Sequence, residues 1–98
     1  MTDFWTALEH HIHAVTGQPF VIRQRQPLGG GCINRAWRIS DGQRTFFVKV
    51  NAAANLPWFE AEAASLAELA ATRTVRVPAP MGHGVAAEQA WLMLEYLP

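Results

Sequence analysis

The chain has 98 residues, of which 50% are hydrophobic and 16% charged, and its formal net charge at pH 7 is zero. This composition predicts one small folded domain over residues 1–98 and excludes a disordered tail. The charges form no basic stripe, which argues against nucleic acid as a partner, and no apolar stretch is long enough to span a bilayer. The acidic start, Met1-Thr2-Asp3-Phe4, is unlike a signal peptide, so a cytoplasmic location is expected.

The first element expected is a helix that begins after Thr2 or Asp3 and runs to about Val15. Gly17 marks its end. Its apolar residues recur at helical spacing: Phe4, Trp5, Leu8, Ile12 and Val15.

Three strands are expected next, over residues 20–25, 32–39 and 45–50. A glycine turn, Gly29 to Gly31, separates the first strand from the second. Asp41-Gly42 is typical of a two-residue hairpin loop and separates the second from the third. Connections this short predict an antiparallel meander.

A second helix is expected to open at Asn55-Leu56-Pro57, with the proline in its first turn, and to run to about Ala71. An extended segment over residues 77–80 follows, and then strands over residues 83–87 and 90–96. The fold class predicted is α+β, with one antiparallel sheet of about five strands and two helices.

Metal-binding patterns are absent from the sequence. The single cysteine, Cys32, excludes an internal disulfide and a cysteine-based metal cluster. Three of the four histidines, His10, His11 and His13, fall within the first helix, and the fourth is His83. Their spacing matches no zinc signature, so we expect surface histidines and no metal site.

Lys49 is the only lysine of the chain, and it lies within the apolar run Phe46-Phe47-Val48-Lys49-Val50. An ammonium group there needs water or a partner, because burying an unpaired charge is costly. On the second helix, Glu62 falls on the apolar side that Phe59, Ala63, Leu66 and Ala70 mark. The two groups are expected to pair. The alternative is two unrelated groups that each reach solvent by a flexible stem.

Gly29, Gly30 and Gly31 would let a backbone approach phosphate groups closely. Three glycines alone fit an ordinary hairpin turn equally well. The dinucleotide fingerprint and the Walker pattern both fail here. A glycine turn between antiparallel strands fits a phosphate lid of the kinase type better.

Two further parts of the sequence each have two possible roles. Cys32 is either a small strand residue or a redox-sensitive thiol, which could act only by pairing with another molecule. The run from Leu92 to Pro98 is either a plain core strand or a hinge whose backbone binds adenine while Leu94 forms a pocket wall.

Together these segments resemble the fructosamine (ketosamine) kinase family, a branch of the protein-kinase-like fold shared with aminoglycoside and choline phosphotransferases. The resemblance spans nearly the whole chain in the order of that family. It is carried by residues 27–37, 46–51, 59–66, 74–78 and 92–96. The most specific parts are Gly-Gly-Gly-Cys-Ile-Asn, Phe-Phe-Val-Lys and Thr-Val-Arg-Val-Pro.

The resemblance implies the nucleotide-binding lobe of an enzyme that uses ATP and Mg²⁺ to phosphorylate the sugar of ketosamines, the early products of glycation. Lys49 resembles the phosphate-binding lysine and Glu62 its partner on the helix equivalent to αC. The implied loop over the phosphates is Gly29, Gly30, Gly31, Cys32, Ile33 and Asn34. The implied adenine hinge is Leu94, Glu95, Tyr96 and Leu97, with Glu95 and Leu97 offering backbone groups.

The chain stops at Pro98, where the second lobe of the family should begin. The catalytic aspartate and the magnesium ligands belong to that lobe, as do most contacts with a ketosamine small molecule or glycated protein. We therefore expect this chain to be inactive by itself. An exposed apolar patch near Trp91 and Tyr96, or a link through Cys32, would give a homodimer.

Two alternatives stay open. One is a related phosphotransferase that acts on an aminoglycoside, choline or homoserine. The other is a non-catalytic binding or dimerisation module.

Overall fold

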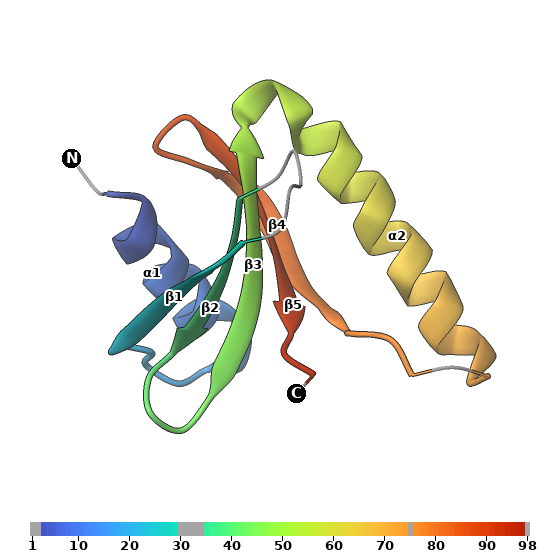
Figure 1. Cartoon of the computed structure of the whole chain (residues 1–98), viewed down its shortest axis with the longest axis horizontal. Coiled ribbons are helices and arrows are strands. Elements are labelled where there is room, and N and C mark those ends of the chain that lie inside the picture. Colours follow the sequence, from blue (N-terminus) through green and yellow to red (C-terminus); the bar gives the residue numbers. More distant parts are fainter. Residues whose placement is uncertain (1–2, 30–34, 75, 98) are drawn as a thin grey trace.

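The computed structural model describes residues 3–29, 35–74 and 76–97. Five strands form one antiparallel sheet in the order β1-β2-β3-β5-β4, and the two long helices lie on opposite sides of it (Figure 1). The α+β prediction is therefore confirmed. The elements are α1 (Phe4–Thr16), β1 (Gln24–Leu28), β2 (Arg35–Ser40), β3 (Thr45–Ala52), a 3₁₀ turn (Ala53–Asn55), α2 (Leu56–Thr72), β4 (Pro80–Ala86) and β5 (Gln89–Glu95).

α1 has the ends that the sequence predicted. The Asp3 carboxylate accepts a hydrogen bond from the Thr6 N–H at 2.7 Å and so caps the first turn. Gly17 closes the helix in the left-handed conformation, with φ at 75°, and its N–H donates to the His13 carbonyl.

One hydrophobic core fills the space between α1 and the sheet. Because strand side chains alternate, Val48 of β3 and both Trp91 and Met93 of β5 point to this side. They pack with Leu8 and Ile12 of α1, both fully buried. Of the two residues near which an exposed apolar patch was expected, Trp91 is only 5% exposed, whereas Tyr96 is partly exposed.

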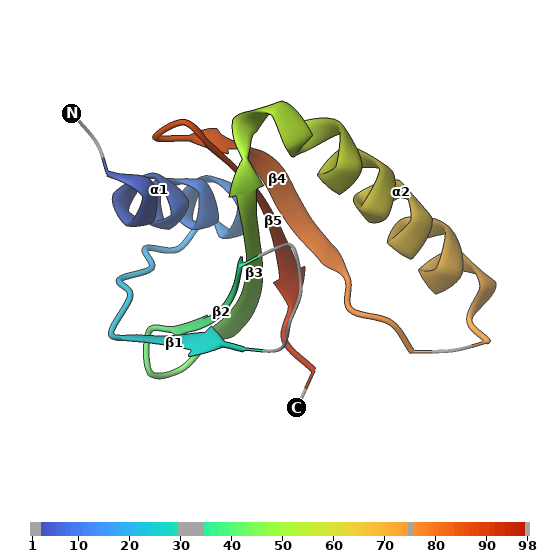
Figure 2. The same ribbon diagram turned by 45° about the horizontal axis from the view of Figure 1, so that its top comes forward.

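A second, smaller core lies on the other side of the sheet, under α2. Phe59 and Ala63 of α2 pack against Leu92 and Leu94 of β5. The predicted apolar stripe ends early, because Ala70 near the end of the helix is exposed. Figure 2 shows the reason: the start of α2 meets the sheet, and its C-terminal end lies away from it.

The first strand begins later than predicted, at residue 24 rather than 20. Pairing starts where Gln24 meets Ser40, the last residue of β2. The preceding segment instead follows α1, where the Ile22 N–H donates to the Glu9 carboxylate at 2.7 Å. Next to it, the Arg23 N–H donates to the Ser40 carbonyl of β2 at 2.9 Å, so the segment passes from contact with the helix to pairing with the sheet. The predicted start of the second strand, residues 32–34, lies outside the described residues.

The loop of the β2–β3 hairpin is longer than the two residues predicted from Asp41-Gly42. Ser40 pairs with Thr45, which leaves four residues in the loop. The Asp41 carboxylate accepts hydrogen bonds from the N–H groups two and three residues later, at 2.9 and 2.7 Å. These bonds give the backbone an alternative to ladder pairing and widen the turn.

The last two strands are shifted from their predicted bounds. β4 begins at Pro80, three residues before the predicted start at His83, and β5 covers 89–95 rather than 90–96. Proline and glycine at the start of β4 gave no strand signal. Pairing with β5 decides the strand there, with a register shift between Pro80 and Gly82.

Candidate functional site

The predicted pairing of Lys49 with Glu62 is confirmed. Lys49 Nζ donates to Glu62 Oε2 at 2.6 Å, and the two side chains are 26% and 32% exposed. Lys49 reaches Glu62 because its neighbours Val48 and Val50 point into the opposite core, which turns the lysine toward α2. This alternation in the sequence of β3 fixes the side of the sheet on which the ammonium lies.

The helix positions Glu62 through its own packed residues. Phe59, one turn earlier, is 2% exposed and anchors the helix against β5. Leu66, one turn later, is partly buried beside it. Glu62 therefore lies on the sheet-facing side of α2, between two residues that pack against the sheet.

A cavity of about 360 Å³ opens beside this ion pair. It is mostly apolar, and the carboxylate and ammonium groups of the pair lie in its wall. A cavity with apolar walls and a few charged groups is typical of small-molecule sites. It is lined by Leu28, Phe47, Lys49, Glu62, Leu66, Pro78, Leu94, Glu95, Tyr96 and Leu97.

The C-terminal end of β5 lines the end of the cavity opposite Lys49. On β5, this end lies beyond Leu92, the residue that pairs with Lys49 of β3. Glu95 lies there, and its backbone N–H donates to the Ala79 carbonyl at 2.8 Å. That N–H is engaged, so of the two backbone groups of Glu95 only the carbonyl is a candidate to bind a ligand. Within the described residues, the Leu97 N–H makes no bond to another backbone group.

The structure gathers six of the predicted site residues around this one cavity: Lys49, Glu62, Leu94, Glu95, Tyr96 and Leu97. Gly29 is exposed and follows Leu28, which lines the cavity. The rest of the predicted phosphate loop, Gly30 to Asn34 including Cys32, lies outside the described residues.

Four lining residues were missed from the sequence: Leu28, Phe47, Leu66 and Pro78. Two of them carried a signal. Phe47 is two residues from Lys49 on the same strand, and Leu66 is four residues from Glu62 on the same helix, so each shares a face with a predicted residue. Pro78 carried none, because its place depends on how the α2–β4 connection folds back.

The described residues contain no group of three or more His, Cys, Asp or Glu side chains that could hold a metal ion. The expectation that all histidines lie on the surface was wrong for His11. Its ring is half-buried, 4.5 Å from the Trp91 ring, and its Nε2 lies 3.4 Å from the Met81 carbonyl. His83 lies on β4, where its Nε2 is 3.7 Å from Glu60 of α2.

The two aspartates are structural in their contacts. The backbone N–H of Thr6 holds the pKa of the Asp3 carboxyl below its usual value, and that of Arg44 does the same for the pKa of Asp41. Neither aspartate lines the cavity. No helix among the described residues is both long and apolar enough to cross a membrane.

Known proteins share the sequence pattern and the fold of this chain. The family model described as fructosamine kinase matches residues 4–98. Over 93 residues the chain is 44% identical to a "probable ketoamine kinase" of Synechocystis sp. and 33% identical to one of Vibrio cholerae, in each case covering 95% of this chain and 32% of the relative.

The fold also matches a solved structure, that of a candidate fructosamine-3-kinase from Haemophilus somnus. The TM-score is 0.91 at 33% identity, over 96% of this chain and 32% of that one. The chain thus spans about a third of the length of the relatives it matches. It belongs to the fructosamine kinase family, and its fold is that of the N-terminal lobe of the kinase-like fold.

Proposed function

We propose that this chain is the ATP-binding lobe of a ketosamine kinase, which transfers the γ-phosphate of ATP to a sugar hydroxyl of glycated amines. The observation that carries the proposal is the Lys49–Glu62 pair, 2.6 Å apart in the wall of a cavity of about 360 Å³. The names of the relatives support the acceptor class, because they are described as ketoamine and fructosamine kinases.

Lys49 has the role of a phosphate-binding cation in this proposal. Glu62 accepts one of the three ammonium protons and fixes the direction of the lysine side chain. The remaining protons are available to phosphate oxygens at the same end of the cavity. In kinases a lysine–glutamate pair of this kind must be in place before phosphoryl transfer.

Adenine would lie between the apolar walls further along the strand. The cavity is lined by Leu28 of β1 and by Phe47 of β3 and Leu94 of β5, which are cross-strand partners. The Glu95 carbonyl and the Leu97 N–H are the backbone groups proposed to bind the base edge. An aromatic base between aliphatic and aromatic side chains gains from apolar contact without needing a charge.

Phosphoryl transfer of this kind uses Mg²⁺. The two carboxylates in the cavity wall are already bound, Glu62 to Lys49 and Glu95 to Ala79 and Arg76. The described residues therefore do not fit a magnesium site, and no step of the proposal uses the ion. Its ligands, the catalytic aspartate and the acceptor site are expected outside this chain.

The proposal places the activity in the repair or catabolism of glycated amines, in the cytoplasm. The acceptor is a ketosamine small molecule or a glycated protein. A homodimer linked through Cys32 stays a prediction, and an oxidant-induced, reducible dimer that Cys32→Ser abolishes would support it.

The test of function is phosphorus NMR of the full-length protein with magnesium-ATP and a fructosyl-amine. A new sugar phosphate monoester, with matching loss of ATP, is the expected result. A folded protein that binds ATP and forms no monoester would contradict the ketosamine assignment. Choline, homoserine and an aminoglycoside, tried in the same assay, would then separate the related phosphotransferases from a binding module.

Lys49→Met tests the role of the ammonium. The methionine keeps an apolar stem of similar length, so the fold should persist, and turnover should fall by about 10²- to 10³-fold because one stabilising cation is lost. The melting temperature should change little, since a partly exposed ion pair adds little stability. Glu60→Gln, two residues from Glu62 and facing His83, is the matched control. Full turnover in Lys49→Met would contradict the assignment.

A further inference from the structure

The connection between α2 and β4 is stiff and has few backbone donors. Pro78 and Pro80 both lack an N–H, so the Ala79 N–H is the one backbone donor from residue 78 to residue 80. A residue that precedes proline is restricted to extended conformations, which applies to both Val77 and Ala79. The position of this stiff segment should therefore depend on the group that accepts a hydrogen bond from the Ala79 N–H.

Glu95 binds Ala79 at both of its backbone groups. The Glu95 N–H donates to the Ala79 carbonyl at 2.8 Å, and Glu95 Oε1 accepts from the Ala79 N–H at 3.3 Å. Its second oxygen, Oε2, accepts from Arg76 at 3.2 Å. Glu95 thus joins the end of β5 to the α2–β4 connection, by its backbone N–H and by both oxygens of its carboxylate.

The residues next to these contacts form the cavity wall. Pro78 precedes Ala79, and Tyr96 follows Glu95, and both line the cavity. The Tyr96 ring is in turn covered by the Arg38 guanidinium of β2, 5.2 Å from its centre. Along β5, Glu95 is three residues beyond Leu92, the partner of Lys49, which is about 10 Å of strand.

We propose that the Glu95 carboxylate is a positioning residue for the base-binding end of this cavity. By holding the Ala79 N–H it fixes Pro78 on one side of the nucleotide base and the backbone of residues 95–97 on the other. This inference rests on the proposed ATP-binding function. The family resemblance implies a role only for the backbone of Glu95, in binding adenine. The present inference assigns a separate role to its side chain.

The two side-chain contacts of Glu95 differ in weight. Arg76 is 72% exposed, and an ion pair with so exposed a partner contributes little. The bond to Ala79 is partly buried and satisfies the one backbone donor of residues 78–80. The acceptor oxygen of Glu95, rather than its charge, should therefore hold the wall.

Three substitutions in the full-length protein separate these contacts. Glu95→Ala removes both, Glu95→Gln keeps an amide oxygen for Ala79 but loses the charge, and Arg76→Ala removes only the ion pair. Glu68→Ala, an exposed glutamate of α2 away from the cavity, is the matched control. Calorimetric titration with adenosine probes the base end, and titration with magnesium tripolyphosphate probes the Lys49 end.

Glu95→Ala should weaken adenosine binding by about tenfold and leave tripolyphosphate binding unchanged. Glu95→Gln and Arg76→Ala should each stay within about threefold of the wild type for both ligands. Equal adenosine affinity in Glu95→Ala and wild type would overturn the inference, and so would an equal loss for both ligands, which indicates general loosening of the lobe. A wild-type protein that binds neither ligand would instead overturn the proposed function, and this inference with it.

Discussion

His11 and Gly82 show how single residues attach α1 to the sheet. The His11 ring rests edge-on against Trp91 and lies beside the Met81 carbonyl. Gly82 faces the ring with φ at 143°, a backbone conformation that residues with a side chain rarely adopt. A Cβ atom at Gly82 would overlap His11 Nε2. The absence of a side chain at residue 82 is thus what lets α1 approach β4.

Gly82→Ala should therefore lower the free energy of unfolding by about 2–3 kcal/mol, from overlap together with backbone strain. Urea unfolding followed by tryptophan fluorescence measures it. The double variant with His11→Ala should recover part of the loss, because it removes the overlap and leaves the strain. Gly84→Ala, whose Cβ would meet the Trp91 ring at 3.2 Å without a positive φ, should cost less. A Gly82→Ala protein as stable as wild type would contradict this reading of the contact.

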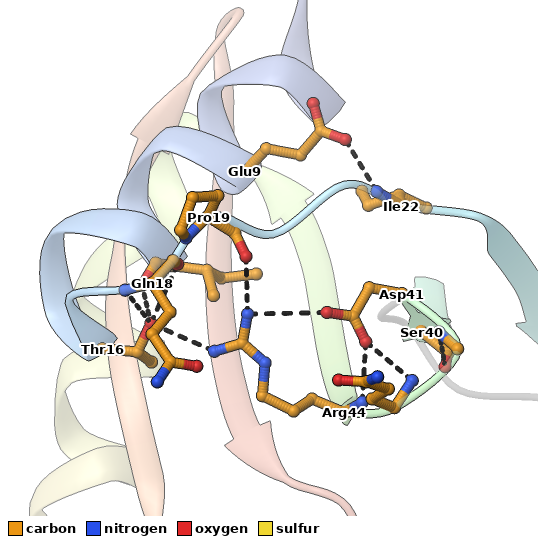
Figure 3. A network of polar contacts seen from close by, with 11 residues as sticks. Glu9, Thr16, Gln18, Pro19, Ile22, Ser40, Asp41 and Arg44 are labelled. Carbon is orange, nitrogen blue, oxygen red and sulfur yellow. Dashed lines mark hydrogen bonds and ion pairs between the residues drawn. The ribbon is translucent and has the colours of Figure 1, made fainter.

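At the scale of elements, a polar network ties the β2–β3 hairpin to the end of α1 (Figure 3). Arg44 donates to Thr16 Oγ1 at 3.2 Å and to the Pro19 carbonyl at 2.8 Å. Its guanidinium also lies 3.5 Å from the Asp41 carboxylate. The same carboxylate accepts the Arg44 backbone N–H, so one loop aspartate orders both the hairpin and the arginine.

This network predicts a pH dependence. The Arg44 backbone N–H lowers the pKa of Asp41 below its ordinary value of 3.8, so the folded state prefers the charged form. The stabilisation is complete above 3.8 and is lost as the pH falls through that value toward the folded pKa. The stability difference between wild type and Asp41→Ala should therefore shrink in acid, measured by urea unfolding at several pH values. For Gln43→Ala, which removes no titrating group, the difference should stay constant. An Asp41→Ala difference that is independent of pH would contradict the prediction.

The β4–β5 turn places two non-glycine residues at positive φ, Ala87 at 48° and Glu88 at 64°. Tight hairpin turns demand this geometry, and glycine meets it without strain. Glu88→Gly should raise the free energy of unfolding by up to about 1 kcal/mol, readable as a higher melting temperature. Glu88→Ala keeps the Cβ strain and should give no gain. A destabilised Glu88→Gly protein would show that the Glu88 side chain contributes more than the strain it causes.

The helices and strands differ in how well the sequence predicted their bounds. The helices were predicted closely, because caps and apolar spacing are local signals, as at Asp3 and Gly17. Strand bounds were less accurate, since pairing is decided by a partner far away in sequence. Pro80 is part of β4 because it pairs with Leu94 of β5, and Ile22, which was predicted to lie in the first strand, donates to Glu9 of α1 instead.

At the scale of the whole molecule, one sheet separates two hydrophobic cores, and only one of them supports the candidate site. The larger core lies under α1, and the smaller core, under α2, holds Phe59 behind the Lys49–Glu62 pair. Stability and the candidate site can therefore be disturbed separately. The site depends on the smaller core, because the position of Glu62 follows that of α2.

Phe59→Leu and Ile12→Val test this separation, one in each core. Each change should cost about 1 kcal/mol of stability, since each shrinks or reshapes one buried side chain. Only Phe59→Leu should also weaken ATP binding in the full-length protein, by loosening Glu62. Chemical unfolding and calorimetric titration give the two readouts. Equal ATP affinity in both variants would show that the position of α2 does not depend on this contact.

The sequence by itself determined the α+β class, the helix ends and the pairing of Lys49 with Glu62 in the candidate site. Lys49 stood out because a lysine in an apolar strand needs a partner, and Glu62 because a carboxylate on a packed helix face needs one too. The need of each charged group for a partner follows from its local sequence, so it can be predicted without a structure. The structure met them with a single 2.6 Å contact.

Only the tertiary structure decided what surrounds that pair. Pro78 enters the cavity wall, and the Glu95 N–H is taken by Ala79, because the α2–β4 connection folds back along β5. Trp91 and His11 are covered because α1 crosses that face of the sheet. Each of these outcomes depends on segments far apart in the chain, whose meeting is fixed by the packing of the whole molecule rather than by any local pattern.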